Sequence, residues 1–140
     1  RLAFTERMHG YDRQRPEGML ALVFLDLNGF KRINDTIGHE AGDAVVREFA
    51  RRLRAAAGPT GFVARIGGDE FVVLVEVGPQ VARETFRARM RALTRGIENR
   101  LAEPVVIPAT TLNISAAQGL AFWESDDMTA AELIRRADLA

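Results

Sequence analysis

One stretch constrains the fold of this chain more than any other, namely residues 62–77, FVARIGGDEFVVLVEV. Two runs of β-branched, aromatic and aliphatic residues flank the tetrapeptide Gly67-Gly68-Asp69-Glu70. Such runs favour strands, and a Gly-Gly pair can supply the positive φ angles that short hairpin turns need. The sequence therefore predicts a β-hairpin that carries two carboxylates at its tip.

Folding alone does not explain these acids, because it is costly to desolvate an unpaired charge beside a buried strand. Residues 19–27, MLALVFLDL, form a second apolar run, typical of a strand covered on both faces, and it contains a third acid, Asp26. If the strands are neighbours, Asp26 and Asp69 could hold one or two Mg²⁺ ions together with water and phosphate oxygens. Glu70 fits less simply, because successive residues of a regular strand face opposite ways, and only a distorted turn would bring it in.

Length and composition indicate a single domain over residues 1–140. A chain of 140 residues with 47% hydrophobic content can bury one core. Nineteen basic and nineteen acidic residues balance, so no overall charge attracts nucleic acid or a membrane surface. There is no cysteine, and no apolar run approaches the roughly 18 residues of a membrane span. We therefore expect a cytoplasmic domain that contacts neither nucleic acid nor membrane.

The remaining patterns predict helices packed on a sheet. The expected helices are residues 1–15, a short helix from Asn28 as N-cap to Gly38 in the left-handed conformation, residues 40–57, residues 80–102 and a last helix capped by Thr129. Further strands are expected at 105–107, 112–117 and 120–123. This order indicates an α/β (α+β) sandwich with a central, mostly antiparallel sheet.

Helix 40–57 has the clearest amphipathic pattern. Val45, Val46, Phe49 and Leu53 form an apolar stripe that should pack on the sheet. Its arginines are expected largely outside that stripe; they are Arg47, Arg51, Arg52 and Arg54.

Two motifs together resemble the signature of a known family. The first is RIGGDEF, which ends at Phe71, and the second runs from Asp26 to Asp43 and reads DLNGFKRINDTIGHEAGD. GGDEF-domain diguanylate cyclases show the pattern D-x-D-x-F-K-x-x-N-D-x-x-G-H-x-x-G-D after an apolar strand, and here Asn28 replaces the second Asp. The resemblance covers nearly the whole chain and implies a fold like the palm of class III nucleotidyl cyclases and polymerases.

The resemblance implies that two GTP molecules are condensed into cyclic di-GMP and two pyrophosphates in bacterial signalling. The 3′-hydroxyl of each GTP would attack the α-phosphate of the other, so catalysis would need a homodimer in which two domains face each other. Two Mg²⁺ ions, for which Mn²⁺ could substitute, would be held by Asp26, the Leu27 carbonyl, Asp69 and Glu70. Either Asp69 or Glu70 would serve as the general base.

The resemblance also implies how GTP is bound. Lys31, the one lysine beside 18 arginines, would contact phosphate and offset charge in the transition state. Backbone N–H groups around Gly29 and Phe30 would face the triphosphate. Asn34 and Asp43 would read guanine, since a carboxylate accepts from N1–H and N2–H₂ donors that adenine lacks.

The other implied contacts are less specific. His39 either touches the nucleotide or is a capping or packing residue. Gly67 and Gly68 would lie against the substrate, and Arg65 would steady the acidic cluster.

Two departures from the family pattern carry expectations of their own. Gly58 and Gly61 stand where many diguanylate cyclases have an R-x-x-D motif that binds the product, so product inhibition through that site should be absent. Residues 136–140, RADLA, resemble the start of a closing motif that contains a phosphate-binding lysine and arginine. We therefore expect the natural protein to continue at both ends, with a flanking sensor domain or EAL phosphodiesterase domain.

A second hypothesis belongs to another class. In tandem proteins a GGDEF domain can be a catalytically silent GTP-binding module that regulates an attached EAL domain. A purely structural domain is a third hypothesis, but it leaves Asp26, Asp69 and Glu70 without a physical reason.

Overall fold

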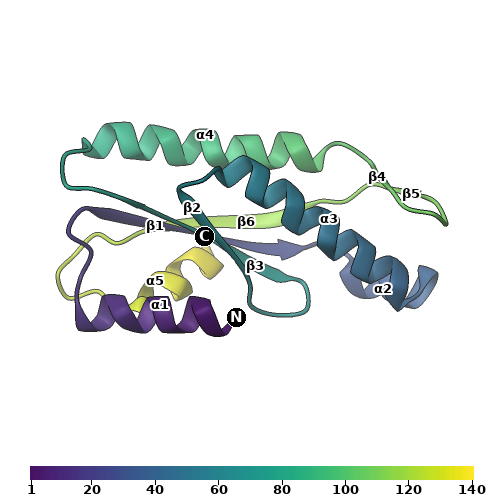
Figure 1. Ribbon diagram of the computed structural model, residues 1–140, viewed down its shortest axis with the longest axis horizontal. Helices are drawn as coiled ribbons and strands as arrows, with labels where there is room; N and C mark the ends of the chain where they lie inside the picture. Colours follow the sequence, from purple (N-terminus) through teal and green to yellow (C-terminus); the bar gives the residue numbers. More distant parts are fainter.

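The computed structural model describes residues 1–140 and has five helices on a central antiparallel sheet (Figure 1). The elements are α1 (Leu2–Arg13), β1 (Met19–Leu27), α2 (Phe30–Ile37), α3 (His39–Ala57), β2 (Gly61–Arg65), β3 (Glu70–Val77), α4 (Arg83–Leu101), β4 (Val105–Val106), β5 (Thr111–Leu112), β6 (Ala116–Phe122) and α5 (Ala130–Leu139). The main sheet has the order β2-β3-β1-β6, and β4 and β5 form a separate small hairpin. The predicted α+β architecture is confirmed.

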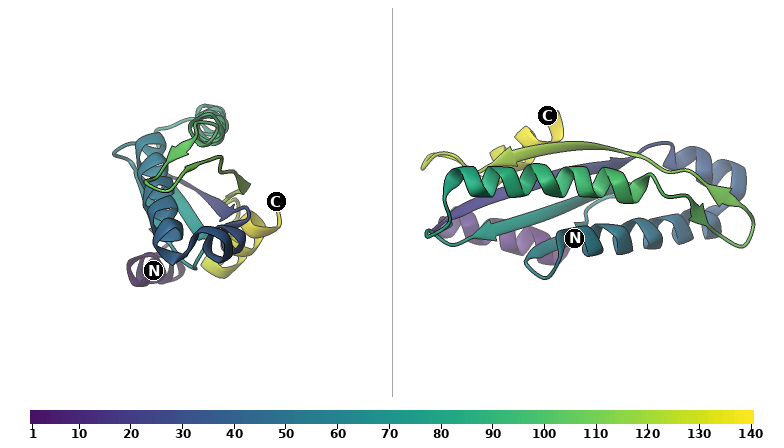
Figure 2. Two further views of the ribbon diagram at one scale, coloured as in Figure 1. Left: turned by 90° about the vertical axis from the view of Figure 1, so that its right-hand side faces the viewer. Right: turned by 90° about the horizontal axis from the view of Figure 1, so that it is seen from above.

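Strand β1 lies inside the sheet, between β3 and β6, and both of its faces are covered. Its odd-numbered residues, such as Val23, pack with apolar side chains of α3 and α4. Its even-numbered residues, such as Leu22, pack with side chains of α1 and α5. Figure 2 shows the two pairs of helices on opposite sides of the sheet. The continuous apolar run of β1 follows directly from this burial, as predicted.

The predicted helices form close to their expected limits. The stripe of α3 is buried as expected, from Val45 to Leu53. Thr129 caps α5, because its Oγ1 accepts a hydrogen bond from the N–H of Glu132 at 3.1 Å. Helix α1 ends before Pro16 and buries Phe4, Met8 and Tyr11. No helix combines the length and the apolar character needed to cross a bilayer.

The expectation for Arg52 is wrong, because its side chain is only 6% exposed. Its guanidinium donates to the carbonyls of Arg100, Glu103 and Pro104 at 2.9, 2.6 and 3.0 Å. Its Nε donates to Glu48 at 3.0 Å. The last carbonyls of a helix have no intrahelical partner, and the planar guanidinium satisfies them here at the end of α4.

The expectation for Asn28 as an N-cap is also wrong. Helix α2 has Gly29 at its N-cap, with φ 70°, and no side chain caps it. Asn28 instead donates from Nδ2 to Ser115 Oγ at 3.0 Å and from its backbone N–H to the Ser115 carbonyl at 2.9 Å. Gly38 has a positive φ of 103° but an extended ψ of 163°, so it ends α2 outside the left-handed helical region.

Candidate functional site

The predicted hairpin is formed by β2 and β3, with Arg65 opposite Phe71. The N–H groups of Ile66 and Gly67 both donate to the Glu70 carbonyl, at 2.9 and 3.3 Å. Residues 67–69 therefore form the tip of the hairpin, between the last paired residues of the two strands.

The physical role predicted for the Gly-Gly pair is wrong. The glycines with positive φ are Gly29, Gly38 and Gly58, and neither Gly67 nor Gly68 is among them. A Cβ on Gly67 would lie 2.6 Å from Glu70 Oε1, whereas a Cβ on Gly68 would meet nothing within 4 Å. Gly67 thus leaves space for the Glu70 side chain to fold back under the loop.

Arginines from two elements hold the hairpin tip. Arg65 donates from Nε to the carbonyls of Gly67 and Gly68, both at 3.1 Å, and from Nη2 to that of Gly68 at 2.6 Å. Arg1 donates to the Ile66 carbonyl. Arg65 therefore contacts the loop backbone directly, and its guanidinium fixes the segment that carries Asp69.

The end of β1 brings Asp26 beside the acids of the hairpin. Asp26 is directly opposite Glu70 in the antiparallel ladder, and the Leu27 N–H donates to the Asp69 carbonyl at 2.8 Å. Since β3 begins at Glu70, Asp69 lies in the hairpin loop, where the alternation of side chains along a regular strand does not fix its direction. The ligation of a shared ion by Glu70 stays a prediction.

The charged groups that act on Asp26 at this edge of the sheet are all carboxylates. Burial raises the pKa of Asp26, and the neighbouring carboxylates of Asp69, Glu70 and Asp138 raise it further, Asp69 also through a hydrogen bond. Asp138 lies on α5, and the sequence offered no signal that would have placed it here. Ionised Asp26 is therefore disfavoured by burial and by the neighbouring carboxylates.

The oxygen donors of Asp26, Asp69 and Glu70 have the chemistry that Mg²⁺ prefers. They are not preassembled, because no three acidic or histidine side chains in the structure are close enough to ligate one ion. The Leu27 side chain is 2% exposed and packs in the core, so this residue could contribute only through its backbone.

Helix α2 starts immediately after the acid-bearing end of β1. Gly29 has φ 70° and is followed by Phe30, the first residue of the helix. Lys31 is exposed in the first turn and makes no ion pair within the chain. The backbone N–H groups at the start of α2 and the Lys31 ammonium therefore lie close in sequence to Asp26 and can bind an anionic ligand.

The two residues expected to read guanine lie on helices that cross closely. A Cβ on Gly42 would lie 1.8 Å from Asn34 Oδ1, so the missing side chain lets α3 approach α2 at Asn34. Asp43 follows Gly42 and is exposed. His39 is the exposed first residue of α3, and no side chain caps that helix. The fold therefore brings Asn34 next to the residue preceding Asp43.

The two glycines in place of the R-x-x-D motif have local structural roles. Gly58 ends α3 with φ 70°, and a Cβ on Gly61 would lie 2.6 Å from Ala57 Cβ. Larger residues at either position would strain this turn.

Comparison with known proteins agrees with this geometry. The family model for the diguanylate cyclase GGDEF domain matches residues 1–140. MucR of Pseudomonas aeruginosa, a bifunctional diguanylate cyclase/cyclic di-GMP phosphodiesterase, is 39% identical over 126 residues, which are 90% of this chain and 17% of MucR. NbdA, a cyclic di-GMP phosphodiesterase from the same organism, is 34% identical over 128 residues, which are 91% of this chain and 15% of NbdA.

Solved structures show the same fold. The crystal structure of the GGDEF domain of PA1120 from Pseudomonas aeruginosa superposes with a TM-score of 0.82 at 32% identity and covers 100% of this chain and 85% of that one. The chain spans less than a fifth of the length of MucR and NbdA. Since the family model extends over every residue and the hairpin, acids and helix order agree with it, the chain belongs to the diguanylate cyclase GGDEF-domain family.

Proposed function

We propose that this chain is a catalytic diguanylate cyclase domain, which condenses two GTP molecules into cyclic di-GMP and two pyrophosphates. The observation that carries the proposal is the convergence of Asp26, Asp69 and Glu70 at one edge of the sheet. This uncompensated negative charge calls for a cation, and the start of α2 beside it offers Lys31 and backbone N–H groups for phosphate.

In this mechanism Asp26, the Leu27 carbonyl, Asp69 and Glu70 would hold two Mg²⁺ ions. Bound Mg²⁺ would neutralise phosphate charge and favour ionisation of the attacking 3′-hydroxyl. Asp69 or Glu70 takes the proton of that hydroxyl, and Lys31 stabilises the charge that develops on the phosphate.

Substrate selection is assigned to α2 and α3. Asn34 and Asp43 bind guanine, with the Asp43 carboxylate accepting from N1–H and N2–H₂, and His39 lies close enough in sequence to contact the nucleotide. Gly29, Phe30, Gly67 and Gly68 offer backbone groups, and Arg65 keeps the hairpin tip in place.

One domain has one set of guanine-binding residues, so the reaction requires a homodimer with two sites facing each other. We assign residues 1–140 to a single GGDEF domain of a longer cytoplasmic protein, since GTP is a cytoplasmic substrate and the chain matches only 17% of MucR. A sensor or EAL domain would flank it. Without an arginine and an aspartate at positions 58 and 61, we propose no product inhibition at that turn.

A second candidate function is a GTP-binding regulatory module without turnover. Two observations favour it: NbdA is named only as a phosphodiesterase, and the acids here are not preassembled around one ion.

The test is GTP turnover with Mg²⁺ by the protein, by Asp69→Asn and by Asp127→Asn, with the products separated by chromatography. Asp127 is an exposed acid outside the cluster and serves as the matched control. Cyclic di-GMP from the protein and from Asp127→Asn, but not from Asp69→Asn, supports the cyclase. GTP binding that weakens in Asp43→Ala, without product, would instead support the regulatory module. Failure to bind GTP at all would leave a structural domain.

A further inference from the structure

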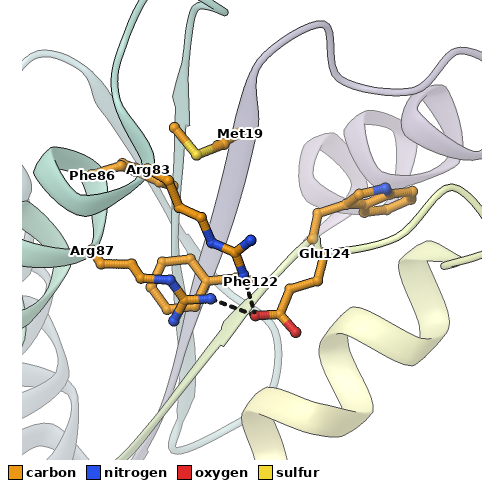
Figure 3. Close-up of a pocket in the computed structure, with 7 residues that line it drawn as sticks. Met19, Arg83, Phe86, Arg87, Phe122 and Glu124 are labelled. Atoms are coloured by element: carbon orange, nitrogen blue, oxygen red, sulfur yellow. Dashed lines mark hydrogen bonds and ion pairs between the residues drawn. The ribbon is translucent and has the colours of Figure 1, made fainter.

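A second concave site lies at the start of β1, at the other end of this strand from Asp26 (Figure 3). Its volume is about 210 Å³, and it is formed by the start of β1, the first turns of α4 and the end of β6. At about 3.3 Å per residue along β1, Met19 in this pocket is roughly 23 Å from Asp26. The pocket is therefore separate from the candidate cyclase site.

Two arginines of α4 converge on one carboxylate at the mouth of this pocket. Arg87 Nη2 lies 2.6 Å from Glu124 Oε1, and Arg83 Nη2 lies 3.7 Å from the same oxygen. Figure 3 shows both guanidinium groups directed at Glu124. Two cations face one anion, so the pocket keeps a surplus positive charge. The Arg83 side chain is 68% exposed, which leaves its remaining N–H donors accessible.

The other walls of the pocket are apolar and partly aromatic. Phe122 meets Phe86 edge-on with ring centroids 5.8 Å apart, and the guanidinium of Arg87 lies 4.4 Å from the Phe122 centroid. Met19 completes the apolar side chains of the lining, whereas the Trp123 ring packs near Tyr11 on the other face of the sheet, with ring centroids 6.4 Å apart. A cation–π contact of this kind holds Arg87 in position before any ligand arrives.

The size of the pocket limits what it can hold. An apolar cavity of about 150 Å³ accommodates a benzene molecule, and sites for drug-sized ligands begin at about 300 Å³. A volume of about 210 Å³ therefore fits one ring with a small substituent. The surplus positive charge favours an anionic substituent.

We propose that this pocket binds a small aromatic carboxylate. Its ring lies against Phe122 and Met19, and its carboxylate accepts hydrogen bonds from Arg83 and Arg87 in the place of Glu124. Arg87 already donates a hydrogen bond to the Glu124 carboxylate, Arg83 Nη2 lies 3.7 Å from the same oxygen, and a planar guanidinium can bind a carboxylate in a bidentate way. The Glu124 side chain is 42% exposed, so it can turn into solvent when a ligand enters.

Calorimetry measures binding to this pocket directly and needs no side-chain reporter. We would titrate the protein with sodium benzoate and record the heat of binding, without GTP or Mg²⁺. Benzamide tests the need for charge, and inorganic phosphate tests the need for a ring. We expect a saturable response to benzoate and at least tenfold weaker binding of the other two. Because no nucleotide is present, the outcome does not depend on cyclase activity.

Three variants separate a binding site from a plain ion pair. Arg83→Gln removes an exposed donor and should weaken benzoate binding about tenfold or more, as loss of a charged hydrogen bond does. Glu124→Gln removes the competing carboxylate and should tighten binding several-fold. Arg91→Gln, at an exposed arginine of α4 without an ion pair, should leave the affinity within twofold.

Specific outcomes would overturn the proposal. One is no saturable response in either the unmodified protein or Glu124→Gln, which would make the three charges a contact that only joins α4 to β6. Another is equal affinity for benzoate and benzamide. A third is an Arg83→Gln variant that binds as tightly as the unmodified protein.

Discussion

The charge of Arg52 at the end of α4 is compensated by hydrogen-bond partners, whereas the charge of Asp26 at the edge of the sheet is not. At Arg52 four of the five N–H donors of the guanidinium are used, by Glu48 and by three carbonyls at and just after the end of α4. At Asp26 the neighbours are other carboxylates, and burial and their charges raise its pKa. A matched buried charge such as Arg52 supports the fold, whereas like charges gathered around the exposed Asp26 are maintained at a cost and mark a candidate ligand site.

The largest expected effect tests the unmatched region. Asp26→Asn should lower cyclic di-GMP formation about 10³-fold, since a metal ligand contributes roughly 4 kcal/mol to the transition state. Its free energy of unfolding at pH 7 should stay the same or rise, because the change removes a disfavoured negative charge. Product analysis and urea unfolding would measure both effects. A variant that loses activity because it unfolds would break the comparison.

The second prediction tests the matched region. Arg52→Met should lower the free energy of unfolding by about 3 kcal/mol, because it removes four hydrogen bonds of a buried guanidinium, three of them to carbonyls at and just after the end of α4. Arg51→Met is the matched control, since Arg51 also bonds Glu48 but is exposed. Urea unfolding should show little change for the control. Equal midpoints for the two variants would mean that the hydrogen bonds from Arg52 to these carbonyls do not stabilise the fold.

The third prediction concerns the Gln118 side-chain amide, of which the nitrogen has a hydrogen-bond partner and the oxygen has none. Gln118 donates from Nε2 to the Thr94 carbonyl at 3.3 Å, but its buried Oε1 has no partner. Gln118→Leu should raise the free energy of unfolding by about 1 kcal/mol, because an unsatisfied buried oxygen is replaced by apolar surface beside α4. Thermal or urea unfolding would test it against Gln80→Leu, an exposed position. Destabilisation by Gln118→Leu would show that the Thr94 bond outweighs the orphaned oxygen.

The smallest expected effect is a pH dependence in the matched region. Hydrogen bonds from Arg51 and Arg52 lower the pKa of Glu48 to about 2. Its contribution to stability is therefore present above its ordinary pKa of 4.5 and is lost as the pH falls toward 2. The difference in unfolding free energy between the unmodified protein and Glu48→Gln should shrink over that interval. A difference that does not change between pH 6 and pH 2 would contradict the shift.

Local patterns were sufficient for much of the fold. The unbroken apolar run of β1 predicted burial on both faces, the spacing in α3 predicted its buried stripe, and Thr129 predicted the start of α5. The closeness of Asp26 to the hairpin acids also followed from two neighbouring strands. Each of these depends on residues close in sequence or on a simple pairing of strands.

Patterns failed where a side chain is satisfied by a distant segment. Arg52 looked like a solvated arginine, but its acceptors lie about fifty positions further along the chain. Asn28 looked like a cap, yet its partner is Ser115. The Gly-Gly pair was assigned to positive φ, whereas Gly67 is needed for the space occupied by Glu70.

The sequence by itself determined the helices, the hairpin, the two-sided burial of β1 and the residues that can carry chemistry, whereas the strands expected at 112–117 and 120–123 are in fact β5 (Thr111–Leu112) and β6 (Ala116–Phe122). Only the tertiary structure decided which of the charged groups are neutralised and which are not. It joined Arg52 to the end of α4, set Asp138 near Asp26 and closed a pocket between Arg83 and Glu124. The reason is physical: periodicity reports which face of an element is buried, but compensation of a charge depends on atoms brought together from distant parts of the chain.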